Sequence, residues 1–144
     1  MEWMIMPYKR YADFEGRSRR MEYWMFSLFY LIVAAILAGL MIAGIPRPEV
    51  DEFGAVTGDQ DPGVLFWLTV GLLTVFVLGS IVPSIAVAVR RLHDQDKSGW
   101  LYLLSFIPYI GGLILLVLMF LPGTTGPNQY GEDPKDPNAA SVFD

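Results

Sequence analysis

Long uncharged stretches alternate with short polar segments along this chain of 144 residues. Three stretches carry no Asp, Glu, Lys or Arg: residues 23–46, 62–89 and 100–121. An α-helix rises about 1.5 Å per residue, so about 20 apolar residues cross the ~30 Å hydrocarbon core of a bilayer. The pattern therefore predicts an all-α integral membrane protein with three transmembrane helices, at about residues 23–45, 64–89 and 100–121. These uncharged runs are too long to favour buried helices of a soluble protein.

Prolines and glycines interrupt two of the predicted spans. Pro83 divides the second span, which we expect to be kinked there, with residues 84–89 as a second short helical piece. Pro108 and the pair Gly111–Gly112 fall in the middle of the third. They are compatible with one kinked span or with a re-entrant hairpin, and we favour the kinked span.

Polar segments surround the predicted spans. Residues 1–22 mix aromatic and charged residues as at a membrane surface, and Pro7 is expected to break any early helix. The loop at 47–61 is acidic and rich in Pro and Gly, and residues 90–100 form a polar helix–loop between spans two and three. Residues 122–144 form a tail dense in turn formers, and 135–144 are expected to be disordered. The predicted organisation is thus a flank (1–22), a membrane domain (23–121) and a tail (122–144).

Composition and charge refine this picture. Apolar residues make up 53% of the chain and charged residues 17%, below the roughly 25% charged residues of soluble domains. Eight of the ten Lys and Arg residues lie in the N-terminal flank or in the polar segment 90–100. The positive-inside rule then predicts a cytoplasmic N-terminus, and three crossings would place the C-terminus outside. Ser18-Arg19-Arg20 imitates a twin-arginine export signal, but the apolar run that follows is too long for one.

Three motifs occur in order along the chain, beside the predicted spans. With x for any residue, they are Phe14-x-Gly16-Arg17-x-Arg19-Arg20-x-Glu22-Tyr23-Trp24, Arg90-Arg91-Leu92-His93-Asp94-x-x-x-Ser98-Gly99-Trp100 and Pro122-Gly123-x-x-Gly126-x-Asn128-x-Tyr130-Gly131-x-Asp133-Pro134. Together they resemble the three blocks of the DUF805 family, small bacterial inner-membrane proteins with no established activity. The resemblance covers about residues 10–134 and implies a location in the inner membrane of a bacterium. It supplies no chemistry.

The residues do not favour an enzyme. His93-Asp94 superficially matches a phosphohydrolase motif, but such sites need several His ligands and this chain has one His and no Cys. The same shortage argues against zinc. A Ser–His–Asp arrangement would need Ser84 or Ser98 to face His93, with no nucleophile-elbow motif to support it. We therefore expect a non-enzymatic protein without metal or cofactor.

Basic residues predict a binding site at the cytoplasmic surface, because the flank enters the first span where the polar segment joins the other two. An arginine fork suits phosphate, and a basic cleft between helices suits an anionic lipid headgroup. The predicted headgroup ligands are Arg17, Arg19, Arg20, Arg90, Arg91 and His93, with Glu15, Glu22 and Asp94 as structural charge partners.

A purely structural interpretation competes with this one. In it, Arg90 pairs with Asp94 at i,i+4, Arg91 reaches Glu22 or Glu15, and the charges form a joint between helices. The expected partners are the lipid bilayer, anionic phospholipid and a membrane protein or a second copy of the chain, but no nucleic acid. Two further roles stay open: an assembly subunit of a membrane complex, and a subunit of an oligomeric transporter or channel.

Overall fold

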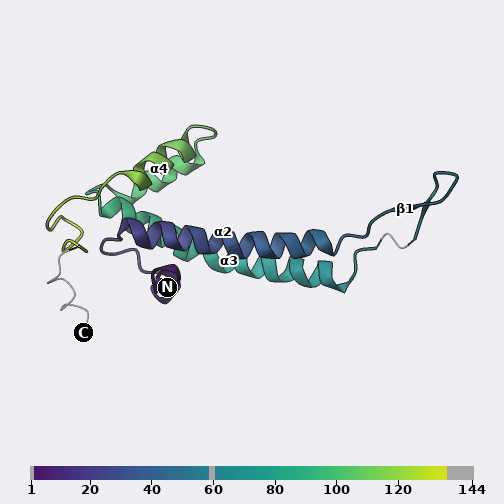
Figure 1. The fold of residues 1–144 in the computed structure, drawn as a ribbon. Helices are drawn as coiled ribbons and strands as arrows, with labels where there is room; N and C mark the ends of the chain where they lie inside the picture. The colour runs from purple at the N-terminus through teal and green to yellow at the C-terminus, as the bar shows by residue number, and fades with distance from the viewer. Residues whose placement is uncertain (1, 59–60, 136–144) are drawn as a thin grey trace. The chain divides into compact units, whose positions relative to one another are not determined.

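The computed structural model describes residues 2–58 and 61–135. Its elements in chain order are α1 (Glu2–Lys9), α2 (Arg20–Ala43), β1 (Glu49–Val50), β2 (Val56–Thr57), α3 (Val64–His93), the 3-10 helix η1 (Gly99–Phe106) and α4 (Gly111–Phe120) (Figure 1). The chain divides into two compact units, and α2 and α3 each belong to both. The first unit comprises Met1–Phe29 and Ser80–Asp144, and the second comprises Tyr30–Gly79.

The second unit is a pair of apolar helix segments joined by a loop. Tyr30 of α2 stacks on Phe76 of α3 with ring centroids 5.2 Å apart. At the other end of the pair, Gly44 lies so close to Phe66 that a Cβ on Gly44 would come within 2.8 Å of the Phe66 nitrogen. The two segments are therefore antiparallel, and the missing side chain of Gly44 permits their close approach.

The loop between α2 and α3 contains a short antiparallel hairpin of β1 and β2. Glu49 pairs with Thr57, and Val50 pairs with Val56. The Asp51 carboxylate accepts hydrogen bonds from the backbone of Phe53 and Ala55, which closes the turn. All of the described residues of this hairpin are exposed.

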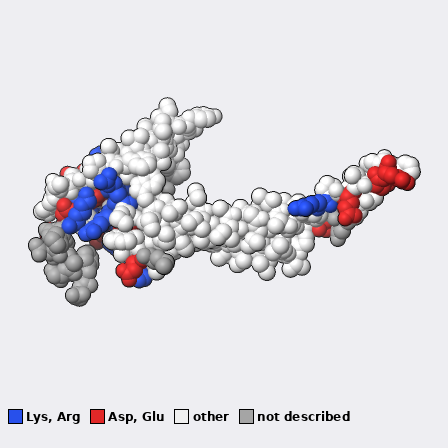
Figure 2. Space-filling model, viewed as in Figure 1, with Lys and Arg blue, Asp and Glu red and all other residues white. Residues whose placement is uncertain are grey.

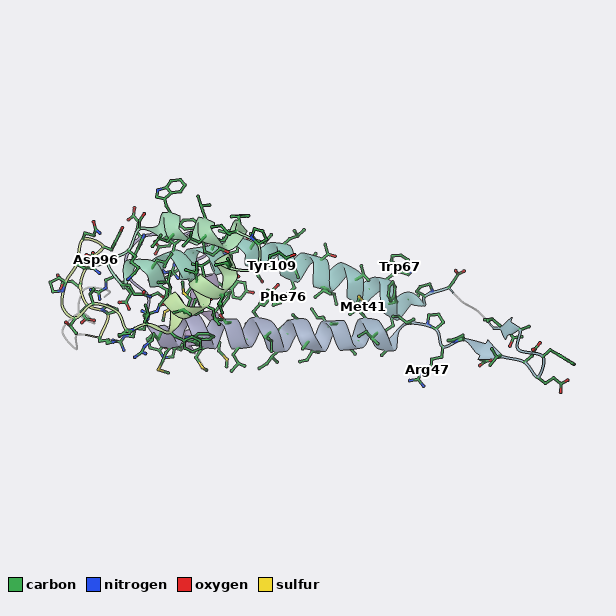
Figure 3. The ribbon with its side chains drawn as sticks, turned by 90° about the horizontal axis from the view of Figure 1, so that it is seen from above. Met41, Arg47, Trp67, Phe76, Asp96 and Tyr109 are labelled. Carbon is green, nitrogen blue, oxygen red and sulfur yellow. The ribbon has the colours of Figure 1, made fainter. Side chains whose placement is uncertain are left out.

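Both α2 and α3 are long and apolar enough to cross a membrane. Large apolar side chains of the second unit are exposed around both helices; Leu31 and Trp67 are each 63% exposed, and Trp67 is labelled in Figure 3. Such extensive apolar exposure is costly in water and suits contact with lipid. The mostly helical fold with two candidate spans agrees with the first two spans predicted from the sequence.

α3 continues through Pro83 to His93 as one helix of 30 residues, so residues 84–89 belong to the same helix as the residues before Pro83, and the predicted kink stays a prediction. Proline removes only one helical hydrogen bond, the one that its nitrogen would donate to Gly79. The helix retains its other bonds on both sides of this position. The predicted short second piece is therefore the last part of α3.

Pro7 was expected to break any early helix, and this prediction is wrong, since Pro7 lies inside α1. The neighbouring Tyr8 holds α1 against the two longer helices of the first unit. Its ring meets Phe26 and Phe29 edge-on, at 5.3 and 6.3 Å, and its hydroxyl lies 2.6 Å from Ser80 Oγ. These contacts offset the one helical bond that proline removes from a helix of eight residues.

The third predicted span is not confirmed, because residues 99–120 form a helical hairpin of η1 and α4 and not one kinked helix. η1 and α4 pack against each other, and a Cβ on Gly111 would come within 1.7 Å of the Leu104 carbonyl oxygen. Only glycine permits this approach. The turn between the two helices includes Tyr109, which has φ +67° and is 99% exposed at the tip (Figure 3). Each arm is about 15 Å long, half of a ~30 Å hydrocarbon core.

The tail returns to the end of α3 at which the hairpin starts. The Thr124 backbone donates to the Asp94 carbonyl oxygen at 2.8 Å, and the Asn128 side chain donates to the His93 carbonyl oxygen at 2.9 Å. Residues 122–135 thus lie beside the N-terminal flank, because that flank also contacts Asp94. The prediction that three crossings place the C-terminus outside stays a prediction. The expected disorder at 136–144 lies outside the described residues.

Single cysteines test this arrangement cleanly, since the chain has no cysteine of its own. Glu15→Cys, Thr125→Cys and Thr57→Cys all change exposed residues. We expect a membrane-impermeant maleimide to label the first two from one side of the membrane and Thr57→Cys from the other. Labelling of Thr125→Cys from the same side as Thr57→Cys would restore the three-span arrangement.

Candidate functional site

The Asp94 carboxylate lies at the centre of a buried cluster of charges in the first unit. Asp94 directly follows α3 and is 1% exposed. One of its oxygens accepts from Arg17 Nε at 3.1 Å and lies 3.0 Å from Arg17 Nη2, and the other pairs with Arg91 Nη1. Because burying a charge costs several kcal/mol in real proteins, both arginines depend on this carboxylate.

The tail surrounds the Arg17 guanidinium with carbonyl groups. Arg17 Nη2 donates to the Thr124 carbonyl at 2.6 Å and Nη1 donates to the Gly126 carbonyl at 2.7 Å. A turn with Gly126 at φ +77° and Gly131 at φ +130° directs these carbonyls inward. Every nitrogen of the Arg17 guanidinium therefore has a partner.

Asp133 holds this turn closed. Its carboxylate accepts from the backbone N–H groups of Lys135 at 2.9 Å and Gly126 at 3.0 Å. These bonds stabilise the charged form, and they hold the pKa of the Asp133 carboxyl below its usual range. The last acidic residue of the third sequence motif thus supports the carbonyls that bind Arg17.

A second ion pair joins α3 to the start of α2. Arg90 Nη2 donates to Glu22 Oε1 at 2.9 Å, with both side chains almost fully buried. Arg90 Nη1 donates to the Asp13 carbonyl, and the Arg90 carbonyl accepts from the Ser18 backbone at 3.1 Å. The flank is thus attached to α3 through side-chain and backbone contacts.

Arg91 and Gln95 satisfy the last carbonyls of the hairpin. Arg91 Nη2 donates to the Leu121 carbonyl, and Gln95 Nε2 donates to the Leu118 carbonyl at 2.6 Å. The final carbonyls of a helix have no partner within the helix and carry partial negative charge, so a guanidinium stabilises the end of α4. These bonds hold the returning arm of the hairpin against the cluster.

The predicted residues come together, but with different pairings. Arg90 was expected to pair with Asp94 and Arg91 with Glu22 or Glu15; instead Arg90 takes Glu22, and Arg91 takes Asp94 at i,i+3. Glu15 is exposed and has no ion pair among the described residues. Glu22 and Asp94 thus lie in the ion pairs of the cluster, and Glu15 lies outside them.

Arg19 and Arg20 lie at the edge of this cluster. Arg19 Nε donates to the Pro134 carbonyl, and the guanidinium lies 5.7 Å from the ring of Trp3. Arg20 is exposed and donates one 3.3 Å bond, to the Phe120 carbonyl. In Figure 2 the blue atoms of Lys and Arg gather on the first unit, whereas the loop of the second unit is mostly red.

His93 has a different environment from the arginines. Its ring lies parallel to that of Tyr130, with 3.8 Å between centroids and 3° between planes. Its Nδ1 lies 3.3 Å from the Gly16 carbonyl oxygen. His93 is therefore held by a backbone carbonyl and an aromatic face, and the neighbouring Asp94 faces the arginines.

This geometry offers little for catalysis. The His93 ring has a carbonyl beside Nδ1 where a catalytic triad needs a carboxylate. Within residues 2–58 and 61–135, no group of three or more His, Asp or Glu side chains is arranged to hold a metal ion. The cluster is built to keep charges paired.

Sequence reasoning missed the contribution of the tail. Gly123, Thr124, Asn128 and Tyr130 all contact residues 93–94, yet none was predicted as part of the site. All four lie in the third sequence motif, so the presence of this motif together with the two basic motifs was the available signal that the tail belongs to the site. Gln95, at the end of α3, was missed as well.

These features define a class: a small helical membrane protein with two candidate spans and a buried charge cluster. The family described as "Protein of unknown function (DUF805)" matches residues 11–132, and the chain belongs to this family. Inner membrane protein YhaI of Escherichia coli (strain K12) is 40% identical over 136 residues, which cover 94% of this chain and 97% of that protein. Inner membrane protein YhaH of the same strain is 37% identical over 135 residues, covering 94% and 98%. No solved structure matches.

A methyl group at position 123 tests the packing around Asp94. A Cβ on Gly123 would come within 2.0 Å of Asp94 Oδ2, and two arginines hold that oxygen's carboxylate in place. We expect Gly123→Ala to lower the free energy of unfolding in detergent by about 1–3 kcal/mol, as overpacking does. Gly112→Ala is the matched control, since nothing lies within 4 Å of its Cβ. Equal stability of the two variants would show that the tail does not pack on Asp94.

Proposed function

We propose that this protein is a non-enzymatic inner-membrane protein that binds anionic lipid headgroups at the edge of its charge cluster. Arg19 and Arg20 are the contacting residues, while Arg17, Arg90 and Arg91 hold the cluster together. One observation supports this division of the arginines into two groups. Arg17, Arg90 and Arg91 are buried and use both Nη atoms internally, whereas Arg19 is half-buried, Arg20 is exposed, and each donates one hydrogen bond.

The charge distribution supports an orientation with flank and tail in the cytoplasm. All Lys and Arg residues except Arg47 lie in the flank, in the last turn of α3, in the polar segment after it or in the tail. With the tail beside the flank, nine of the ten basic residues share one side of the membrane. The positive-inside rule then places this side in the cytoplasm and the acidic loop outside.

The position of Arg20 supports contact with headgroups. α2 begins at Arg20, and its only other charged residue is Glu22 in the same first turn. One turn further on, Trp24 and Phe120 lie with ring centroids 4.4 Å apart. The guanidinium thus lies where an apolar helix begins, which is the depth at which lipid phosphates lie.

The buried charges favour an anion over a neutral ligand. Three buried arginines, at positions 17, 90 and 91, face two buried acids, Glu22 and Asp94. Because Arg17 and Arg91 share Asp94, the cluster carries a net charge of about +1, and Arg19 and Arg20 add two positive charges at its edge. A phosphate beside these two residues would offset that charge.

A structural or assembly subunit is the second candidate. It is supported by the pairing of Arg17, Arg90 and Arg91 inside the chain, which requires no ligand. A transporter or channel has less support, because the charged residues of α2 and α3 lie in the first turn of α2 and the last turn of α3.

Lipid retention in the double variant Arg19→Gln/Arg20→Gln tests the proposal. Each basic residue near an anionic surface contributes about 1 kcal/mol to binding. The affinity for phosphatidylglycerol, measured by native mass spectrometry, should therefore fall roughly 30-fold when both residues are changed. Lys97→Gln/Lys135→Gln removes the same charge from other positions of the first unit and should retain nearly all of the bound lipid. Equal losses in the two double variants would refute a site at Arg19 and Arg20.

A further inference from the structure

A cavity of about 500 Å³ lies beside His93 in the first unit. Its volume is in the range of ligand pockets. Aromatic and aliphatic side chains form most of its wall, among them Phe14, Val89, Trp100 and Leu103. Its polar side chains include His93 and Ser98. The cavity shares no residue with the proposed contact at Arg19 and Arg20.

An apolar stripe of α3 leads into this cavity. Ile81, Ile85, Val89 and His93 are spaced four residues apart and therefore share one face of the helix. Ile85 and Val89 line the cavity, and Ile81 is 46% exposed on the span side. An apolar chain along this stripe would bring its polar end to the imidazole.

The hydrogen bonding of His93 determines which polar end fits. A carbonyl oxygen only accepts, so the contact between Nδ1 and the Gly16 carbonyl requires the proton on Nδ1. In the neutral ring, Nε2 then carries a lone pair. Nε2 faces Gly99 at the cavity wall, where a Cβ would come within 3.1 Å of it, and no described residue donates to it. The cavity thus presents an acceptor that needs a donor.

Ser98 supplies the complementary group. Its Oγ accepts from the Trp100 backbone at 3.3 Å, and its hydroxyl hydrogen has no acceptor among the described residues. Ser98 and Gly99 both line the cavity. A ligand hydroxyl could therefore donate to Nε2 and accept from Ser98. A charged phosphate or carboxylate has no hydrogen to donate, and the lone pair of Nε2 would repel it.

We propose that this cavity binds a neutral lipid alcohol, a long apolar chain that ends in a free hydroxyl group. The hydroxyl donates to His93 Nε2, and the chain follows Val89, Ile85 and Ile81 toward the span. Two kinds of membrane lipid have this chemistry: diacylglycerols and long-chain isoprenoid alcohols. The proposal is independent of the anionic site at Arg19 and Arg20.

Binding by the full chain in phosphatidylcholine nanodiscs tests the proposal, with bound ligand counted by native mass spectrometry. The probes are dioleoylglycerol and a polyprenol, each beside its methyl ether, which lacks the donor. We expect at least one alcohol to bind about fivefold or more tightly than its ether, the effect of one neutral hydrogen bond. The alcohol that shows this preference identifies the source. Equal binding of alcohol and ether for both pairs would overturn the proposal, as would no binding of any probe.

Two substitutions of His93 separate its nitrogens. The amide of His93→Asn can still donate to the Gly16 carbonyl but has no atom at the position of Nε2, whereas His93→Gln reaches that position. We expect His93→Asn to lose about fivefold in affinity for the alcohol and none for the ether, and His93→Gln to recover part of the loss. Unchanged alcohol affinity in His93→Asn would overturn the assignment of Nε2.

A filled cavity gives a test that does not depend on His93. Ile85→Trp places a large side chain in the apolar stripe and should abolish alcohol binding. Leu113→Trp is the matched control, because Leu113 is 61% exposed on α4 and does not line the cavity. Full binding by Ile85→Trp would overturn the proposal, and so would equal loss in both variants.

Discussion

Asp94 is the residue on which the first unit depends. Its one carboxylate holds Arg17 from the N-terminal flank and Arg91 from the last turn of α3, and its backbone carbonyl holds Thr124 of the tail. A buried ion pair contributes little net stability against a well-packed apolar alternative, but a buried charge that loses its partner costs about 3–5 kcal/mol. The cluster therefore specifies which segments meet, because separating them would leave a buried charge without its partner at that cost.

The cluster also explains how a short apolar hairpin can belong to a membrane protein. Neither arm is long enough to cross a bilayer, and a hairpin that starts and ends at one point needs an attachment there. Arg91 and Gln95 provide it by binding the carbonyls of Leu121 and Leu118. The hairpin, the flank and the tail are thus all attached at the end of α3. The cavity at His93 lies beside this attachment.

Part of this arrangement could be predicted from the sequence. The uncharged runs at 23–46 and 62–89 indicate the two long helices, because each run is long and apolar enough to cross a bilayer as a helix. The meeting of Arg17, Glu22 and Arg90 followed from the argument that the flank and the polar segment lie at one surface.

The sequence could not decide between a hairpin and a kinked span at residues 100–121. The hairpin depends on the close approach of Gly111 to Leu104, a contact that the apolar pattern does not encode. The predicted side of the tail depends on this third span. In the structure Arg91 pairs with Asp94 at i,i+3, a spacing that brings side chains together on a helix as i,i+4 does, and Arg90 pairs with Glu22 of α2 instead.

A double-mutant cycle between Arg17 and Asp94 tests the central role of this carboxylate most directly. The free energy of unfolding in detergent would be measured for Arg17→Gln, Asp94→Asn and the double variant. A matched cycle would use the pair Arg10–Asp13, whose atoms approach to 2.6 Å but whose side chains are 32% and 39% exposed. The buried pair should show a coupling of at least about 1 kcal/mol, and the exposed pair at most about 0.5 kcal/mol. Additive effects at Arg17 and Asp94 would contradict the account, because the flank would then be held to α3 by something other than this carboxylate.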